Sequence, residues 1–348
     1  MDICQSLCCR GFFDVFYSTR KHIEIELINF VEIVSMKQIP SVDLSDFLSD
    51  DSNKRQNFIE NIGKAYEEIG FVALKGHFLD QDLVDELYKE VREFFSLPYE
   101  TKAKYEIQGL AGQRGYTSFG KEHAKGRTTG DLKEFFHFGQ NEQPANGEEY
   151  PKNILVDEKP AFNVIGQKTF KALEKTGCFV LRALALHLCL DEYYFDPFIK
   201  GGNSILRAIH YPPITEEPKK AERAAAHGDI NLITLLMGAQ GRGLQVQNHK
   251  GEWIDAIAED DELVINVGDM LSRHTNNKLK STIHRVVNPP KSAWQSSRYS
   301  IPFFMHPVSE MKLDVIPHCI DDQHPKGFQD ITAGEFLEER LRELGLRK

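Results

Sequence analysis

The 348-residue chain has few cysteines, no excess of basic residues and no long uninterrupted apolar run. Its six cysteines show neither zinc-site spacing nor the density of a disulfide framework, which argues against a small disulfide-stabilised fold. A net charge of −10 disfavours a general polyanion binder, because nucleic-acid surfaces need concentrated Lys and Arg. We therefore expect a protein of the reducing cytoplasm, with no nucleic-acid partner and no membrane partner.

The chain does have enough apolar content for a large core, since 41% of its residues are hydrophobic. We find no internal repeat or low-complexity tract and expect one compact body. Apolar positions at helical spacing predict four helices, over Asn53 to Ile69, Asp80 to Phe95, Pro160 to Leu190, and Ile331 to Leu344 with its charges toward solvent. The glycine-rich stretch from Gly109 to Lys133 predicts a long loop, which we expect to cover the mouth of a site.

A metal-binding pattern stands at His227 and Asp229, which one glycine separates, and at His284 much later in the chain. A His-x-Asp triplet alone arises by chance about once in a chain with thirteen histidines, and a hydrogen-bonded His-Asp pair is its simpler interpretation. In a strand, residues i and i+2 share a face, so a strand end can aim His227 and Asp229 at one point while Gly228 faces away. Two imidazoles and one carboxylate form the facial triad that holds Fe(II) and leaves coordination positions open, which is typical of an oxygenase.

Closing such a triad requires strands that run out and back between Asp229 and His284. Short apolar runs bounded by turn residues predict them at Leu232 to Met237, Leu244 to Gln247, Trp253 to Ala256 and Leu263 to Val267, and an earlier one at Phe71 to Lys75. The sequence therefore predicts a compact barrel or sandwich around the three ligands.

Further motifs accompany the triad: Arg207-Ala208-Ile209-His210-Tyr211-Pro212-Pro213, Gly243-Leu244-Gln245-Val246, Val267-Gly268-Asp269 and Arg298-Tyr299-Ser300-Ile301-Pro302-Phe303-Phe304. With them the chain resembles the Fe(II)/2-oxoglutarate-dependent oxygenases, in the branch of isopenicillin N synthase and the plant hormone and flavonoid oxygenases. The likeness spans nearly everything from Ile39 to Phe304. Plant relatives usually read Asn-Tyr-Tyr where this chain has Ile209-His210-Tyr211, so their substrates do not carry over.

The resemblance implies a mainly β fold with α additions, a double-stranded β-helix (jelly roll, cupin-like) core flanked by helices. It implies an N-terminal α/β region over 36–150, supporting helices over 151–200, the catalytic core over 201–310, and a C-terminal tail and helix over 311–348. Residues 1–35 match nothing in the family, and Glu24, Glu26 and Glu32 interrupt their apolar run, so we expect neither a secretory signal nor a membrane span there. Because Met36 directly precedes the family-like sequence, we expect translation to start at it.

The resemblance also implies the cofactors, which are Fe(II) and 2-oxoglutarate, with O2 as co-substrate and ascorbate as a candidate reductant. His227, Asp229 and His284 would be the catalytic metal ligands. Arg298 would supply a bidentate guanidinium for the distal carboxylate of 2-oxoglutarate, with Ser300 on the same strand face and Tyr211 as further contacts. A surface ion pair for Arg298 and a plain core position for Tyr211 are the alternatives.

Other candidate residues receive simpler interpretations. We expect satisfied polar or core positions for three further histidines, His210, His274 and His306. We expect solvent-facing charges, rather than substrate-steering ones, at Arg114 and Lys133. We expect small apolar packing inside the long helix for Cys178 and Cys189, and a solvated strand for His22 with Glu24, which have ligand spacing but no distal partner.

Three function classes follow. The first is a 2-oxoglutarate-dependent oxygenase that hydroxylates, desaturates or cyclises a small molecule and releases succinate and CO2. The second is an Fe(II) oxidase on the same scaffold that does not use 2-oxoglutarate, like isopenicillin N synthase or aminocyclopropane-carboxylate oxidase. The third is a non-catalytic jelly-roll binding protein. The sequence leaves the substrate, the reaction outcome and the oligomeric state open.

Overall fold

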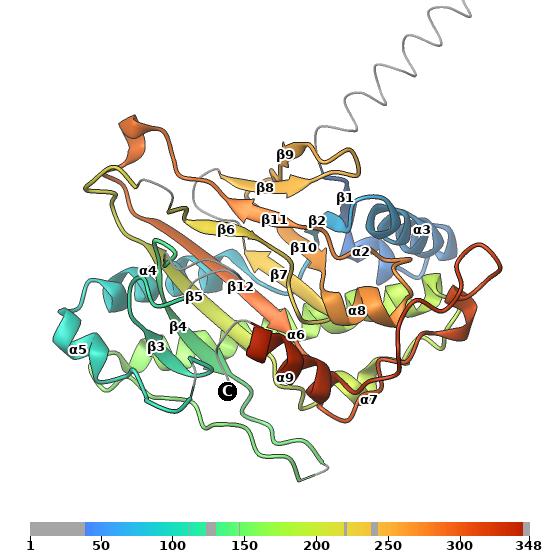
Figure 1. Ribbon diagram of the computed structural model, residues 1–348, viewed down its shortest axis with the longest axis horizontal. Coiled ribbons are helices and arrows are strands. Elements are labelled where there is room, and N and C mark those ends of the chain that lie inside the picture. Colours follow the sequence, from blue (N-terminus) through green and yellow to red (C-terminus); the bar gives the residue numbers. More distant parts are fainter. Residues whose placement is uncertain are drawn as a thin grey trace, which may run out of the picture.

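Two sheets face each other in the structure, a computed structural model that describes residues 39–110, 112–122, 130–145, 147–218, 221–237 and 243–343 (Figure 1). The larger sheet has the strand order β1 (Ser41–Asp43), β2 (Phe71–Lys75), β10 (Leu263–Val267), β7 (Ile233–Met237), β12 (Arg298–Met305), β5 (Ile205–Tyr211), β4 (Glu134–Gly139) and β3 (Gly115–Thr117). The smaller sheet has the order β6 (Ala224–His227), β11 (His284–Val286), β8 (Leu244–Gln247) and β9 (Trp253–Asp255). All neighbouring strands run antiparallel except β1 and β2.

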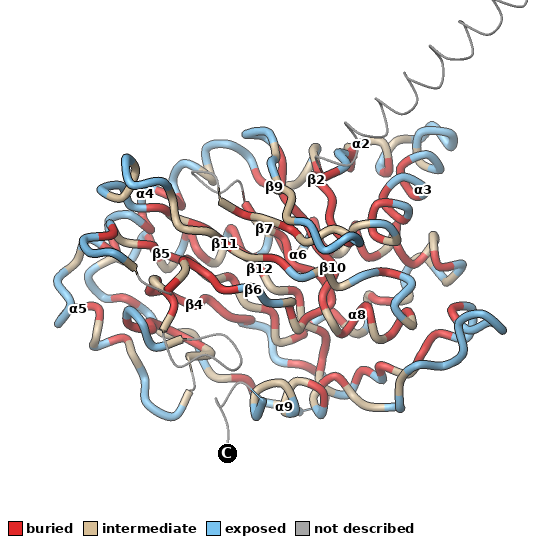
Figure 2. The backbone as a smooth tube through the Cα atoms, turned by 45° about the horizontal axis from the view of Figure 1, so that its top comes forward, coloured by how far each residue is buried: buried red, intermediate tan, exposed pale blue. Residues whose placement is uncertain are grey.

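Helices cover the outer face of the larger sheet. The described helices are α2 (Leu44–Phe47), α3 (Ser52–Glu68), α4 (Gln81–Phe95), α5 (Tyr99–Ala103), α6 (Pro160–His187), α7 (Asp196–Ile199), α8 (Asp269–His274) and α9 (Ala333–Glu343). Of these, α2, α3, α5 and α6 contact strands of the larger sheet, and α4 and α7 pack on α6. The longest, α6, packs against β4, β5, β7 and β12, and most residues of these four strands are buried (Figure 2). Phe303 on β12 meets Phe170 of α6 edge to face, with ring centroids 5.0 Å apart.

Local sequence explains where the first helices begin and end. The Asp51 side chain accepts hydrogen bonds from the backbone N–H groups of Asn53 and Lys54 and caps α3, and Asp80 caps α4 in the same way. After α3 the chain turns at Gly70, which has a φ of +73°. A Cβ at Gly70 would lie 2.0 Å from the carbonyl oxygen of Lys280, so only glycine lets this turn pack against the segment before His284.

Strand alternation gives the larger sheet two different faces. Ile301, Phe303 and Met305 belong to the core on the helix side. On the opposite face an apolar cluster fills the space between the two sheets, and it includes Phe71, Ala73, Ala224, Val246, Val264 and Val286. The inter-sheet space is therefore apolar at one end and leaves room for polar side chains at the other.

Most predicted elements are confirmed within one or two residues, and β2, β8 and β10 have the predicted bounds. The predicted loop from Gly109 to Lys133 is partly wrong, because Gly115–Thr117 forms β3 and pairs with β4. Cys178 lies half-buried in α6 as expected, but Cys189 is exposed beyond the end of that helix. Residues 1–35, with His22 and Glu24, lie outside the described residues. Among the described helices, none is long and apolar enough to cross a membrane.

Candidate active site

The side chains of His227 and Asp229 meet that of His284, which is distant in sequence. His227 ends β6 and His284 begins β11, and the two residues are direct partners in the smaller sheet. Asp229 Oδ1 lies 3.7 Å from His284 Nε2 and 4.0 Å from His227 Nε2. One ligand atom from each residue lies within 4.8 Å of the others, so a single ion can reach all three.

Backbone carbonyls orient both imidazole rings. The Nδ1 of His227 lies 2.7 Å from the carbonyl oxygen of Ala225, and the Nδ1 of His284 lies 3.2 Å from that of Thr282. An Nδ1–H that donates to a carbonyl leaves the Nε2 lone pair free on the opposite side of the ring, toward Asp229. The arrangement presets both histidines as neutral Nε2 ligands.

The position of Asp229 differs from the prediction that it shares a strand face with His227. β6 ends at His227, so Asp229 lies in the following turn and does not share a strand face with the histidine. The backbone N–H of Asp269 donates to the carbonyl oxygen of Asp229 at 2.7 Å. Thr234 Oγ1 and Asn266 Nδ2 donate to its Oδ2 at 2.7 and 2.8 Å. These donors occupy one carboxylate oxygen and leave Oδ1 pointing toward the imidazoles.

The electrostatics of the site favour an uncharged His227 beside a charged Asp229. Burial, followed by the neighbouring His284, lowers the pKa of His227, although 41% of its side chain is exposed and solvent reduces the effect. Burial alone would raise the pKa of Asp229, but His284, His227 and the two hydrogen bonds outweigh it and lower the value. Near neutral pH the carboxylate is therefore charged and His227 is uncharged, as metal binding requires.

Arg298 is a buried cation on the larger sheet, and its guanidinium has no hydrogen-bond partner among the described residues. Arg298 begins β12 and stands opposite Tyr211 at the end of β5, while Ser300 pairs with Ile209. The side chains of Arg298, Ser300 and Tyr211 are at least 96% buried, and the guanidinium carbon of Arg298 is 5.2 Å from the Tyr211 ring centroid. None of the three guanidinium nitrogens of Arg298 has a hydrogen-bond partner among the described residues. An uncompensated buried charge is costly, so this pocket fits an anionic ligand.

Comparison with known proteins shows the family to which this chain, with its His-Asp-His cluster and its buried arginine, belongs. Residues 39–158 match the non-haem dioxygenase in morphine synthesis N-terminal domain, and residues 202–307 match the 2OG-Fe(II) oxygenase superfamily. A 2OG-Fe(II) oxygenase family protein from Caulobacter crescentus is 41% identical, with a TM-score of 0.79 over 88% of this chain and 99% of the other. The chain belongs to the 2OG-Fe(II) oxygenases.

Two further relatives agree with this assignment. A full-length Neurospora crassa protein, solved in complex with alpha-KG (2-oxoglutarate), is 31% identical with a TM-score of 0.77 over 87% of this chain and 96% of that one. The 2-oxoglutarate-Fe(II) type oxidoreductase hxnY of Emericella nidulans is 29% identical over 86% of this chain and 88% of its own length. The expected jelly-roll fold is thereby confirmed, and so is the expected chemistry of a dioxygenase that uses Fe(II), 2-oxoglutarate and O2.

Two charges of this oxygenase that we expected in solvent are buried, so that expectation is wrong. Arg114 is fully buried, and Lys133 is only 8% exposed. Lys133 Nζ lies 2.8 Å from Asp131 Oδ2 and 2.7 Å from Glu122 Oε2, and Glu122 also pairs with Arg207 at 3.1 Å. Lys133 is close enough to His227 to contribute to lowering its pKa. The network forms a polar wall beside the triad.

Sequence reasoning identified the triad but missed the residues that orient it. Thr234 and Asn266 are polar residues inside strands that are otherwise apolar. A polar residue in such a strand needs a hydrogen-bond partner, and this could have identified both as residues that orient a ligand. Of the remaining histidines, His210 contacts Glu134 and Ser297, as expected of a satisfied polar position. His274 contacts Tyr194 through Nε2, but its Nδ1 and that of His306 are buried without a hydrogen-bond partner in the described ranges, so neither is fully satisfied as expected.

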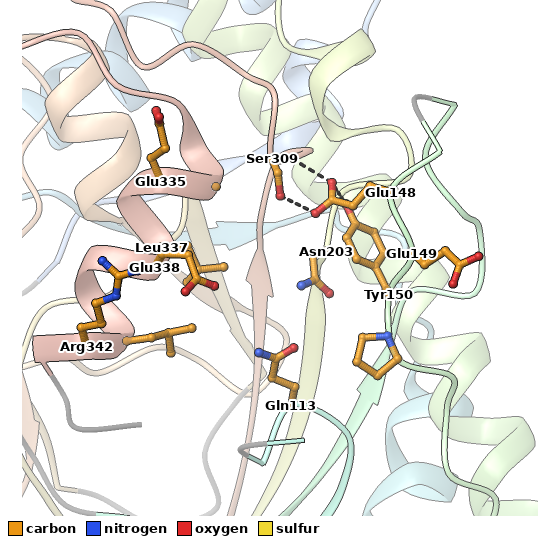
Figure 3. Close-up of a pocket in the computed structure, with 13 residues that line it drawn as sticks. Gln113, Glu148, Glu149, Tyr150, Asn203, Ser309, Glu335, Leu337, Glu338 and Arg342 are labelled. Carbon is orange, nitrogen blue, oxygen red and sulfur yellow. Dashed lines mark hydrogen bonds between the residues drawn. The ribbon is translucent and has the colours of Figure 1, made fainter. Parts of the chain in front are cut away.

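A pocket of about 640 Å³ lies apart from the triad, between α9 and the segment around Tyr150 (Figure 3). Glu335, Glu338 and Arg342 line it from the helix, and Glu148, which bonds Ser309, lines it from the other side. None of the triad residues and neither Arg298 nor Tyr211 borders this space. This pocket is therefore separate from the candidate active site.

Proposed function

We propose that His227, Asp229 and His284 hold the Fe(II) of this dioxygenase and that Arg298, Ser300 and Tyr211 hold 2-oxoglutarate. The observation that carries the cofactor assignment is the buried Arg298 guanidinium, whose three nitrogens have no partner among the described residues and which shares the inter-sheet space with the triad. A planar fork of donors that stays charged fits the distal carboxylate of a dicarboxylic keto acid. The Ser300 hydroxyl, on the same face of β12, is a second donor for that carboxylate.

The chain's residues position the reactants and control their surroundings. When bound, Fe(II) and 2-oxoglutarate would supply an oxidation by O2, in which one oxygen atom enters succinate as CO2 is released and the other oxidises the substrate. The carbonyls of Ala225 and Thr282 keep each imidazole Nε2 directed at the metal position, and Thr234 and Asn266 keep Asp229 in one orientation. The apolar cluster between the sheets limits water on the side away from the mouth.

We propose hydroxylation of a small molecule as the reaction, with desaturation and ring closure as the alternatives. A relative from Petromyces alliaceus that is named a proline hydroxylase is 28% identical over 87% of this chain and 98% of its own length. Reaction under ¹⁸O2 separates the outcomes. Hydroxylation places labelled oxygen in the product, whereas desaturation or ring closure releases an unlabelled product with two hydrogens fewer.

We also propose a cytoplasmic site of action without a nucleic-acid partner. The net charge of −10 and the absence of a basic cluster from the motifs support this proposal. Fractionation of the source cells and a binding assay with duplex and single-stranded DNA at low salt would test it.

The deciding experiment measures 2-oxoglutarate binding and succinate release together. Anaerobic protein with Fe(II) should develop the weak visible charge-transfer band as 2-oxoglutarate is added, and Arg298→Lys should weaken this binding about tenfold or more, because an ammonium cannot reproduce the fork. His227→Ala and Asp229→Ala should abolish iron-dependent succinate release while leaving the circular dichroism spectrum unchanged. Lys168→Ala, on the exposed face of α6, is the control. Full affinity in Arg298→Lys would remove Arg298 from the site, and full turnover in either triad variant would remove that ligand.

A further inference from the structure

A second buried guanidinium lies beside the same tyrosine ring as Arg298. Arg223 immediately precedes β6, four positions before His227, and is 4% exposed. Its guanidinium carbon is 5.6 Å from the Tyr211 ring centroid, compared with 5.2 Å for that of Arg298. The Nε of Arg223 is buried and has no hydrogen-bond partner within the described part of the chain. The guanidinium groups of Arg223 and Arg298 therefore both lie near the Tyr211 ring.

No acid of the described chain compensates this charge. Burial and the like charge of Arg298 lower the pKa of Arg223 to about 10, and no described aspartate or glutamate is among the groups that raise it. Two buried lysines of the described chain are paired with acids: Lys133 contacts Glu122 and Asp131, and Lys102 contacts Glu134 at 2.8 Å. Two like charges in a low-dielectric space repel each other, so the region is electrostatically incomplete without an anion.

The side chains around the two arginines are otherwise apolar on the β5 side. Phe135, Ile209 and Tyr211 form a small cluster of buried hydrophobic residues. Ile209 is the strand partner of Ser300. The second guanidinium, on the residue that immediately precedes β6, reaches the same tyrosine ring.

We propose that Arg223 is a second cofactor-binding residue, which shares the distal carboxylate of 2-oxoglutarate with Arg298. This inference rests on the proposed function, because it assumes that Arg298 receives that carboxylate. An anion held between two guanidiniums relieves the repulsion between them as it binds. The inference goes beyond Arg298 and Ser300, since it adds a residue just before the first strand of the smaller sheet to a pocket otherwise built on the larger sheet.

The test compares two keto acids that chelate iron identically and differ at the far end. 2-Oxoglutarate has the distal carboxylate, and 2-oxobutyrate lacks it. Equilibrium constants come from the anaerobic charge-transfer band, or from calorimetry where the band is too weak. We expect Arg223→Gln to weaken 2-oxoglutarate binding about tenfold or more, as the loss of a charge-assisted hydrogen bond requires. The affinity of Arg223→Gln for 2-oxobutyrate should stay close to that of the wild type. The 2-oxoglutarate affinity of Arg223→Lys should lie between those of the wild type and Arg223→Gln.

Arg114→Gln is the matched control. Arg114 is also fully buried, and its pKa is likewise lowered to about 10 by burial. It bonds Asn203 and the carbonyl oxygen of Gln113, near the opposite end of β5 from Tyr211. Its replacement should not change the ratio of the two keto-acid affinities.

Thermal unfolding without ligand separates binding from a structural role. Because Arg223→Gln removes a buried charge that lacks a described counterion, its ligand-free melting temperature should equal or exceed that of the wild type, while the rise on adding 2-oxoglutarate should shrink. A lower ligand-free melting temperature with equal losses for both keto acids would make Arg223 structural and overturn the inference. Unchanged 2-oxoglutarate affinity would also overturn it, and would leave Arg223 free to bind an anionic substrate. Failure of the wild type itself to bind 2-oxoglutarate would overturn the proposed function as well.

Discussion

At the scale of single residues, the orientation of Asp229 depends on a hydroxyl and an amide inside apolar strands. Thr234 Oγ1 donates to Asp229 Oδ2 at 2.7 Å and accepts from Asn231 Nδ2 at 3.0 Å. All three residues are buried, so water cannot replace either bond without a change in packing. The chain Asn231–Thr234–Asp229 therefore fixes which carboxylate oxygen faces the two histidines.

Replacing Thr234 tests this role. Thr234→Val keeps the shape of the side chain but removes the donor, so we expect Fe(II) affinity to fall roughly 10- to 100-fold, the range found for residues that orient metal ligands. Competition with a chromophoric chelator under anaerobic conditions measures the affinity. Thr234→Ser restores the hydroxyl and should recover most of it. If Thr234→Val bound iron as tightly as the wild type, the hydrogen bond would have no part in positioning Asp229.

The same scale shows what the sequence could and could not predict about the site. The proposed metal ligands His227, Asp229 and His284 and the proposed cofactor contacts Arg298 and Ser300 could be predicted, because their residue types and spacing are visible in the sequence alone. The burial of Lys133 could not, because whether a lysine is buried depends on which acids the fold brings to it. Its partners Glu122 and Asp131 are close in the sequence, but the sequence did not indicate that the fold brings both of them to the lysine.

At the scale of secondary-structure elements, glycines set the distance between α6 and the larger sheet. A Cβ at Gly166 would lie 2.3 Å from Cε1 of Phe138 on β4. That ring cannot move aside easily, because its centroid is 4.8 Å from the Phe162 ring and 5.0 Å from the Phe136 ring. The helix can approach β4 this closely only because residue 166 has no side chain.

We predict that Gly166→Ala destabilises the protein in spite of the better helix propensity of alanine. Overpacking costs about 1–3 kcal/mol, and the gain in propensity is at most about 1 kcal/mol, so the net loss should be roughly 1–2 kcal/mol. Urea unfolding followed by circular dichroism measures it. In a Phe138→Leu background the same change should cost less, so the double variant should lose less stability than the sum of the two single variants. Lys168→Ala, two residues along and exposed, should stay near neutral.

Strand bounds could be predicted where an apolar run in the sequence is bordered by turn residues. β2, β8 and β10 have alternating or continuous apolar runs and turn residues on both sides, so their limits could be read from the sequence. β3 spans three residues inside a glycine-rich stretch and exists because β4 lies beside it, which no local pattern encodes. The end of β6 before Asp229 was missed for a similar reason, because a tertiary hydrogen bond from Asp269 sets it.

At the scale of the whole molecule, buried neutral histidines make stability depend on pH. His137 and His274 are each 3% exposed, and burial lowers the pKa of both below the ordinary value of 6.5. In the unfolded chain these rings take up protons near pH 6.5, whereas in the folded protein they do not. The unfolded state then binds more protons, so the free energy of unfolding must fall as the pH drops below about 6.5.

His137→Gln tests this linkage in metal-free protein. The glutamine oxygen can still accept from Arg207 Nε, which lies 2.5 Å from His137 Nε2, but it cannot be protonated. Between about pH 7.5 and about pH 5.5 the wild type should lose about 1 kcal/mol more stability than the variant. Denaturant unfolding at the two pH values gives the difference. The raised pKa values of Asp269 and Glu174 act in the opposite direction, but they are common to both proteins and cancel in the comparison. Equal losses in the two proteins would mean that His137 is protonated in the folded state, and its contact with Arg207 would then have to break on acidification.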